Sequence, residues 1–204
     1  MKRRKVKAKI KRKFYNIAIC FFSFSFILLG VMVSYRHYQL YKHNNAALSV
    51  YDTFMSLDDI DGPEIDYDIT DLKIGRFNVI GTIRIPSVGI QYPILEKTTP
   101  ESLNLSITKL SGPELNEVGN VSLAGHHSSR GNLFAKLPLV KIGDTIQITD
   151  INKKEISYEV YRIYNVMPDD LEPVEVTDPD KREITLISCI QGGRKRIIVK
   201  AYEI

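Results

Sequence analysis

The chain has 204 residues, of which 44% are hydrophobic and 25% are charged, a balance typical of a folded globular domain and not of a disordered chain. The net charge of +4 is unevenly distributed: the first thirteen residues carry nine lysines and arginines and no acid, whereas 24 acidic residues outnumber 18 basic ones from His37 onward. This separation argues against a nucleic-acid-binding protein, in which basic residues would line the folded domain itself.

An uncharged stretch follows the basic tail of residues 1–13. Residues 14–35 (FYNIAICFFSFSFILLGVMVSY) contain no charged side chain, and about 20 helical residues suffice to cross a hydrocarbon core of roughly 30 Å. The stretch ends without the small-residue motif of a cleavage site, so we interpret it as an uncleaved, single-pass anchor rather than a signal peptide. The basic tail predicts a cytoplasmic N-terminus and an extracellular domain.

Residues 36–77 are interpreted as a linker or N-terminal extension. Residues 36–48 are compatible with a continuation of the helix beyond the membrane, whereas 52–73 are rich in acids and contain the helix-breaking pair Gly62-Pro63. We expect a loosely packed segment with at most one short helix. The alternative is a lid or regulatory arm over an active site.

Residues 78–204 show the pattern of an all-β domain. Apolar and polar residues alternate in short runs that are separated by glycine and proline. We predict a closed or nearly closed β-barrel of seven or eight strands with one or two brief helical turns. The expected strands lie within 79–95 (two strands around Pro86 and Gly89), 120–125, 143–150, 153–167, 183–188 and 195–202, and the helical turns at 100–105 and 133–137.

The two cysteines lie far apart, Cys20 in the anchor and Cys189 near the C-terminus. No intramolecular disulfide is therefore expected, and a single thiol in an exported domain indicates a reactive group or an intermolecular link. In the run EITLISC, Thr185, Ile187 and Cys189 share one face, while Ile184 and Leu186 point the other way, into the core. We predict Cys189 on a groove face at the strand end, the alternative being a buried small side chain.

Two basic groups are candidates to act with this thiol. The Gly192-Gly193 turn predicts an antiparallel hairpin that brings Arg196 back toward Cys189, although Arg194 and Lys195 compete for the same role. His126 and its neighbour His127 follow a strand that ends in glycine, which would place an imidazole at the rim of the barrel. The alternative is a pair of surface histidines without function.

A thiol, an imidazole and a guanidinium suffice for acyl transfer. A thiolate attacks an amide carbonyl, and basic neighbours favour the thiolate form. The imidazole can protonate the leaving amine, and a guanidinium can donate hydrogen bonds to the developing oxyanion. Water or another amine then resolves the thioester.

The motifs that carry these residues resemble those of the sortase family of Gram-positive transpeptidases. SLAGHHSSRGNLFAKL is similar to the family's Ala-Gly-His segment, and ITLISCIQGGRKRIIVKA is similar to its Thr-Leu-x-Thr-Cys strand with an arginine a few residues on. GTIRIPSVGIQYPIL resembles the first two family strands. The resemblance covers residues 78–204 and implies an eight-stranded sortase-type β-barrel.

By this resemblance His126, Cys189 and Arg196 hold the catalytic roles, and His126 rather than His127 matches the histidine after Ala-Gly. Ser188 stands where many members have threonine and keeps the hydroxyl. We expect Thr185, Ile187 and Ser188, on the strand of Cys189, to contact the substrate; these three residues form the expected substrate-binding group.

The resemblance also implies a reaction and its partners. The enzyme would cleave an LPxTG-like sorting signal of surface proteins and pass the acyl group to an amine of a cell-wall precursor or of another protein. No cofactor is implied; some members bind calcium, but Glu114 and Glu117 alone do not make a calcium site. No Asp-Pro-aromatic tripeptide occurs in 50–77 and no second hydrophobic segment is seen, which favours an anchoring enzyme of class A or D type over a pilin polymerase.

Two alternatives remain at this stage. An L,D-transpeptidase also combines histidine and cysteine on a β-rich fold, but its Ser-x-Gly-Cys motif is absent, since Cys189 follows Leu-Ile-Ser. The other alternative is a membrane-anchored β-barrel that binds a partner without catalysis and keeps its cysteine buried.

Overall fold

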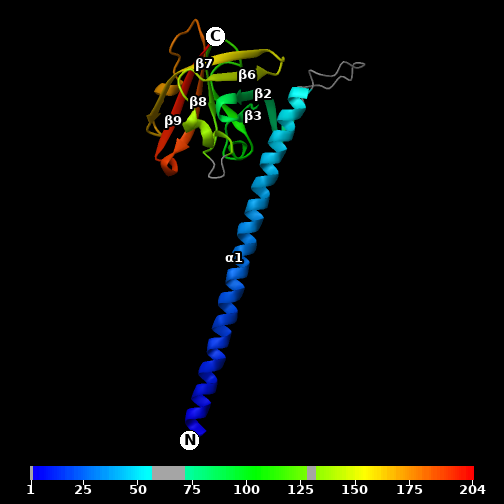
Figure 1. Cartoon of the computed structure of the whole chain (residues 1–204), viewed down its shortest axis with the longest axis vertical. Coiled ribbons are helices and arrows are strands. Elements are labelled where there is room, and N and C mark those ends of the chain that lie inside the picture. The colour runs from blue at the N-terminus through cyan, green and yellow to red at the C-terminus, as the bar shows by residue number, and fades with distance from the viewer. Residues whose placement is uncertain (1, 57–71, 128–131) are drawn as a thin grey trace, which may run out of the picture. The chain divides into compact units, whose positions relative to one another are not determined.

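The computed structural model describes residues 2–56, 72–127 and 132–204 (Figure 1). Within these residues one long helix is followed by nine strands and five short 3-10 turns. The elements are α1 (Lys2–Ser56), β1 (Lys73–Ile74), β2 (Phe77–Ile85), η2 (Pro86–Val88), β3 (Ile90–Leu95), η3 (Ser102–Asn104), β4 (Ile107–Ser111), β5 (Gly119–Ala124), η4 (Phe134–Leu139), β6 (Thr145–Asp150), β7 (Glu155–Val166), η5 (Glu172–Val174), β8 (Arg182–Ile190), η6 (Gln191–Gly193) and β9 (Lys195–Glu203).

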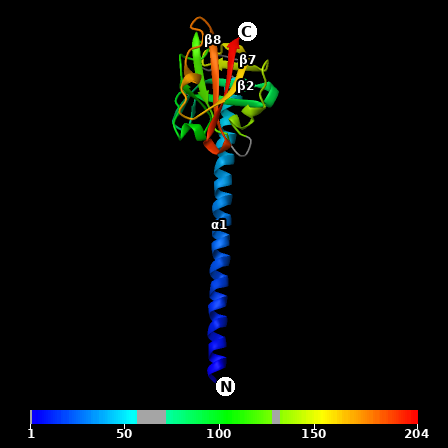
Figure 2. The same cartoon turned by 90° about the vertical axis from the view of Figure 1, so that its left-hand side faces the viewer.

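Strands β2 to β9 form one closed sheet. Their order is β2-β3-β4-β5-β8-β9-β7-β6, and β6 pairs with β2 to close the barrel. The pairs β3–β4 and β5–β8 are parallel and the other pairs are antiparallel. β1 only adds two residues beside β2. The predicted all-β fold with a closed eight-stranded barrel is therefore confirmed, and Figure 2 shows β8 and the red β9 running side by side.

Alternation in the sequence predicts most strands, and its cause is clearest in β7, which buries only one face along its first half. Ile146 and Ile148 of β6 are buried, and so are Ile156, Tyr158 and Val160 of β7, while the residues between them in β7 are half-buried or exposed. The two expected helical turns are present as η3 and η4.

Strand β4 was not among the predicted strands. Ile107 and Thr108 are adjacent yet both buried, so the run does not alternate. Its pairing with β5 shifts register between Lys109 and Ser111. A bulge of this kind places an extra residue in one strand, and the side-chain period of two is lost.

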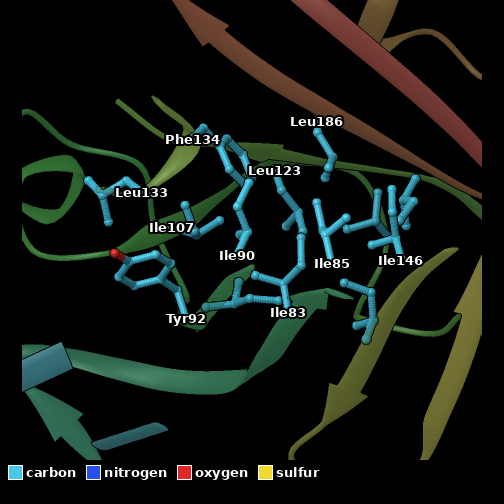
Figure 3. Close-up of a cluster of buried hydrophobic side chains, with 14 of the residues drawn as sticks. Ile83, Ile85, Ile90, Tyr92, Ile107, Leu123, Leu133, Phe134, Ile146 and Leu186 are labelled. Atoms are coloured by element: carbon cyan, nitrogen blue, oxygen red, sulfur yellow. The ribbon is translucent and has the colours of Figure 1, made fainter. Parts of the chain in front are cut away.

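Aliphatic side chains from the strands fill the barrel interior (Figure 3). On β2, Ile83 and Ile85 are buried while Arg84 between them is exposed. Burial of one such isoleucine contributes about 1.5–3 kcal/mol. Phe134 of η4 and Leu133 before it close one side of this cluster, whose labelled members also include Ile90, Tyr92, Ile107, Leu123, Ile146 and Leu186.

The chain divides into two compact units, Met1–Lys42 and His43–Ile204. The helix continues to Ser56, so its last turns belong to the unit that contains the barrel, although the sequence assigned 36–77 to a linker. The acid-rich residues 57–71 lie outside the described part of the chain.

The last turns of α1 pack on the barrel through buried side chains. Ala47 and Phe54 are fully buried members of the hydrophobic core, and the Tyr92 hydroxyl donates to Asn44 Oδ1 at 3.0 Å. The Lys153 Nζ donates to the Phe54 carbonyl and lies 4.4 Å from the centroid of its ring. The helix thus continues over 36–48 as expected, whereas residues 52–56, expected to be loosely packed, bury Phe54 on the barrel.

The first unit contains the segment interpreted as an anchor. Among the described helices, only Ile19–Ser56 is long and apolar enough to cross a membrane, and none of its most apolar stretch is buried. This criterion of length and composition is met by a range that overlaps the predicted anchor, residues 14–35.

Candidate active site

The β8–β9 hairpin carries Cys189 and Arg196 as directly opposed residues. The reversal is made by Gln191, Gly192 and Gly193, which all have positive φ (52°, 68° and 89°), a conformation that glycine adopts without steric cost. Opposed residues of an antiparallel pair project on the same face of the sheet. Cys189 is exposed and Arg196 half-buried, as the predicted groove face requires.

The outer face of this hairpin is a ladder of cross-strand pairs. Moving away from the turn, Cys189 pairs with Arg196, Ile187 with Ile198, and Thr185 with Lys200. The alternate residues of both strands, among them Ile184, Leu186, Ile197 and Val199, belong to the barrel core. The face that carries the thiol is thus distinct from the face that stabilises the barrel.

His126 reaches the thiol from a neighbouring strand. β5 runs parallel to β8, with Ala124 opposite Ile187, and the Gly125 N–H donates to the Ile187 carbonyl at 3.1 Å. Two residues further along each chain, the same register brings His126 level with Cys189. The Phe134 N–H donates to the His126 carbonyl at 3.2 Å and holds this backbone where β5 has ended.

Gly125 is required by close packing. A Cβ atom at this position would lie 2.6 Å from Ile107 Cδ1 and 2.7 Å from Phe134 Cδ2. Both neighbours are fully buried and cannot retreat without opening a void. The Ala-Gly-His motif therefore has a local cause: glycine lets the backbone pass the core directly before the histidine.

Three segments converge on one cavity of about 150 Å³. His126, Cys189 and Arg196 all line it, and Leu103 and Leu110 form part of an apolar wall. Among the described residues no carboxylate pairs with Arg196, so its guanidinium N–H groups remain available to a ligand. The three side chains predicted from separate motifs are thus brought to one site.

A second hollow of about 290 Å³ adjoins the first. Leu110, Ile187 and Arg196 line both, so the two hollows are neighbours that share three side chains. Ile187 and Ile198 from the hairpin ladder lie on one side of the second hollow. The other side comes from the connection between β7 and β8, residues 167–181, here called the cover segment; its lining residues are Asp170, Leu171, Pro173 and Val174.

The expected substrate-binding residues separate into two groups. Ile187 and Ser188 line the first cavity, and the Ser188 hydroxyl donates to the Gly125 carbonyl at 2.9 Å. Thr185 does not reach either hollow: it is fully buried, and its hydroxyl donates to Asn120 Oδ1 at 2.8 Å. Thr185 lies on the same face of the sheet as Cys189, as predicted, but at this position the cover segment lies over that face.

The competing basic residues lie outside both hollows. His127 is exposed and forms a bridge with Leu133. Arg194 and Lys195 are exposed on the turn, and Arg194 Nε donates to the Gln191 carbonyl at 3.2 Å. Position alone therefore favours His126 and Arg196.

Sequence reasoning missed the cover segment and the residues that hold it. Asn120 lies on β5, and its amide donates to the carbonyls of Pro173 (3.1 Å) and Glu175 (2.9 Å). The signal was a buried asparagine inside the strand-like run GNVSLA, where an aliphatic residue would be expected.

Metal binding has no support in the described residues. No three of their histidine, cysteine and acidic side chains are grouped to hold an ion. Glu114, one of the two acids considered for calcium, pairs with Lys109 at 2.8 Å. Cys20 and Cys189 are both free thiols. The chemistry available at the site is that of a thiol with two basic neighbours.

Comparison with known proteins agrees with this geometry. Residues 83–204 match the sortase domain family. Over 202 residues the chain is 33% identical to sortase A of Bacillus anthracis, covering 93% of this chain and 94% of that protein. It is also 34% identical over 113 residues to sortase A of Listeria monocytogenes, which covers 54% of this chain and 49% of that protein.

Solved structures share the fold. The Clostridium perfringens sortase D5 transpeptidase superposes with a TM-score of 0.63 at 25% identity, covering 78% of this chain and 99% of that one. A lid mutant of Corynebacterium diphtheriae sortase A gives a TM-score of 0.59 at 28% identity, with 82% and 95% of the chains covered. Fold, residue arrangement and sequence agree, and the chain belongs to the sortase family of cysteine transpeptidases.

Proposed function

We propose that this enzyme cleaves an LPxTG-like sorting signal through a thioester on Cys189 and transfers the acyl group to an amine. As a sortase it is a transpeptidase of cell-surface proteins. The observation that carries the finer proposal is the cavity shared by an exposed Cys189, His126 and Arg196, which has no carboxylate partner among the described residues. The acceptor would be an amine of a wall precursor or of another surface protein.

In the first half-reaction the Cys189 thiolate attacks the scissile carbonyl carbon. The carbonyl oxygen becomes an oxyanion, which the Arg196 guanidinium stabilises by donated hydrogen bonds. His126, as an imidazolium, then gives its proton to the amine nitrogen as the carbon–nitrogen bond breaks. The products are an acyl thioester and a free amine, and the imidazole is left neutral.

In the second half-reaction the neutral His126 takes a proton from the incoming amine. The amine attacks the thioester carbonyl, and Arg196 again stabilises the oxyanion. Collapse breaks the carbon–sulfur bond, forms the new amide and returns Cys189 as a thiolate beside imidazolium. Water in place of the amine gives hydrolysis, so an acceptor that occupies the site decides the outcome.

The donor peptide would lie across the two neighbouring hollows, here together called the substrate depression. Ile187, Ile198 and Leu171 give it an apolar lining suited to a leucine side chain. The scissile bond would then fall near Cys189. Ser188 supports the site indirectly, because its hydroxyl holds the Gly125 carbonyl next to His126.

Neither alternative interpretation fits as well. Membership of the sortase family removes the L,D-transpeptidase assignment. A binding module without catalysis predicts a buried thiol, and Cys189 is exposed.

The remaining proposal concerns location. Residues 14–35 would anchor the enzyme by a single pass with residues 1–13 in the cytoplasm, so that the barrel works outside the cell. Alkaline extraction should leave the full chain in the membrane pellet, and protease added to cells whose wall has been removed should degrade the barrel. A chain released by alkali would contradict the anchor.

The reaction is tested with the full chain in detergent and a fluorogenic LPxTG peptide. In a Cys20→Ser background Cys189 is the sole thiol, so labelling by an alkylating probe should track loss of turnover. Cys189→Ala should abolish cleavage while the barrel stays folded. Mass spectrometry of products formed with candidate amines identifies the acceptor. Cleavage that persists in Cys189→Ala would overturn the proposal.

A further inference from the structure

A group of buried polar residues beneath the substrate depression has no part in the mechanism above. Three of its members lie on the outer face of the β8–β9 hairpin, two or more same-face pairs away from Cys189, and Asn120 lies on the adjacent strand β5. Its members are Asn120, Thr185, Glu183 and Lys200, each at most 1% exposed. Buried polar groups of this kind require partners, and the partners lie in the cover segment, residues 167–181.

The first attachment is made by Asn120. Its two amide hydrogens are directed to the carbonyls of Pro173 and Glu175, and its Oδ1 accepts from Thr185. Pro173 and its neighbour Val174 line the larger hollow. Asn120 thus fixes the backbone of the residues that form one side of the depression.

The second attachment is made by a buried ion pair. Lys200 Nζ lies 3.1 Å from Glu183 Oε1 and donates to Thr177 Oγ1 at 2.9 Å. The Thr177 hydroxyl also lies 3.2 Å from Glu183 Oε1 and its N–H 3.4 Å from Oε2. The Tyr161 hydroxyl adds a further hydrogen bond to Glu183 at 2.6 Å. The pair therefore holds the segment just beyond the part that lines the hollow.

A third contact lies on the exposed side. Glu172 accepts hydrogen bonds from the Tyr164 hydroxyl (2.5 Å) and from Arg162 (3.1 Å), both on β7. Attachments at 172, 173, 175 and 177 leave little freedom to the stretch between them. A buried ion pair is costly to desolvate and gives little net stability compared with apolar residues. Because this ion pair contributes little to stability yet contacts the cover segment, we infer that it fixes the position of that segment.

We propose that Asn120 and the Glu183–Lys200 pair are positioning residues for the donor peptide. By holding the cover segment they set the shape of the apolar depression before the peptide arrives. The inference rests on the proposed function, because it identifies that depression as the peptide site. Pre-organisation of this kind lowers KM, since the peptide does not have to order the segment as it binds.

The test compares variants of the full chain in detergent. Asn120→Ala removes the first attachment. Thr177→Val removes the hydroxyl that joins the segment to the ion pair, at an exposed position where misfolding is not expected, and Thr177→Ser retains that hydroxyl. Asn116→Ala is the matched control: Asn116 is also buried, donates to the carbonyls of Ile148 and Lys154, and accepts from Tyr158, but it lines neither hollow.

KM for the LPxTG peptide should rise about tenfold in Asn120→Ala and several-fold in Thr177→Val, with kcat within about twofold of wild type. Preference for leucine over alanine at the first peptide position should fall in both. Thr177→Ser and Asn116→Ala should retain the wild-type KM. We expect Asn116→Ala to lower thermal stability as much as Asn120→Ala does, because alanine at position 116 also has to adopt a positive φ. An unchanged KM in Thr177→Val, or an equal rise in Asn116→Ala, would overturn the proposal.

Failure of the proposed function has a different signature: the wild type itself would not cleave the peptide. In that case hydrogen exchange can still test whether Asn120 positions the cover segment. Backbone amides of residues 167–181 should exchange faster in Asn120→Ala than in wild type, with the rest of the barrel unchanged. Unchanged exchange in this segment would remove Asn120 from the role.

Discussion

Cys189 and Arg196 stand directly opposite each other across the β8–β9 hairpin, although six residues separate them in the chain. The side chains of opposed residues leave the sheet on the same face, about 4.5–5.5 Å apart at Cβ. A shift of one residue in the register would move the guanidinium to the core face. The turn at Gln191–Gly193 therefore fixes part of the active site as well as the hairpin.

The first prediction concerns Arg196. Arg196→Lys should lower kcat by about 100-fold with little change in KM, because one ammonium cannot reproduce the paired hydrogen bonds of a guanidinium at the oxyanion. Arg194→Lys is the control, since Arg194 lies on the exposed turn outside both hollows, and it should keep wild-type kcat. Steady-state cleavage of the fluorogenic peptide measures both, and equal activity in Arg196→Lys would remove the oxyanion role.

The second prediction separates the adjacent histidines. His126→Ala should lower kcat by about 10²–10⁴-fold, because no other described imidazole lines the cavity to protonate the leaving amine. His127→Ala should stay within about twofold of wild type, since that side chain is exposed and outside the cavity. The same peptide assay decides, and a dead His127→Ala variant would reverse the assignment.

Local patterns in the sequence predicted the parts of the molecule that depend on local periodicity. The alternation in β8 placed Cys189 on an accessible face, and the glycine turn predicted its pairing with Arg196. The barrel followed from the same alternation in its other strands. Convergence of His126 on the site was inferred from family resemblance, because the parallel pairing of β5 with β8 has no signal in either strand alone.

What the sequence did not predict depends on contacts between distant segments. Thr185 lies on the expected face of β8, but the cover segment buries that face. The residues near Thr185 in the sequence give no sign of this burial. The bulge in β4 hides the strand from a periodicity argument. The acid-rich stretch after Ser56 suggested a loose linker, whereas the preceding helical turns bury Phe54 against the barrel.

The third prediction is a pH dependence of stability at the cover segment. The hydrogen bond from Tyr164 lowers the pKa of Glu172 below its ordinary value of 4.5. The unfolded chain therefore binds more protons than the folded chain near pH 4, so this contribution is present above pH 4.5 and is lost as the pH falls through the folded-state pKa. Tyr164→Phe should lower the free energy of unfolding at pH 7 by less than about 1 kcal/mol, because the site is half exposed, and Tm should fall accordingly. This loss of stability should become smaller toward pH 3.

A double-mutant cycle isolates this effect. In a Glu172→Gln background the side chain at position 172 no longer titrates, so Tyr164→Phe should cost the same stability at pH 7 and at pH 3. Thermal unfolding followed by near-UV circular dichroism suits a chain with 11 tyrosines and no tryptophan. A pH-dependent cost of Tyr164→Phe that survives in the Gln background would show that another group is responsible.

The fourth prediction concerns the last turns of α1. Phe54 is fully buried, with the Lys153 ammonium over its ring and its carbonyl bound by the same side chain. Phe54→Ala should destabilise the barrel by about 3 kcal/mol, which corresponds to a fall in Tm of roughly 6–12 °C. The neighbouring Thr53 is exposed and its hydroxyl donates to the Ser49 carbonyl of its own helix, so Thr53→Ala should change stability by no more than about 0.5 kcal/mol.

Truncated chains distinguish a helix end that is part of the folded barrel unit from a flexible linker. If the turns before Ser56 are part of the barrel unit, a chain that begins at His43 should unfold at a higher temperature than one that begins at residue 57, since only the first retains Ala47 and Phe54 in the core. If they are a linker, both truncated chains and Phe54→Ala should unfold with the wild-type barrel. Equal unfolding temperatures for the two truncated chains would therefore assign the helix end to the linker despite its burial.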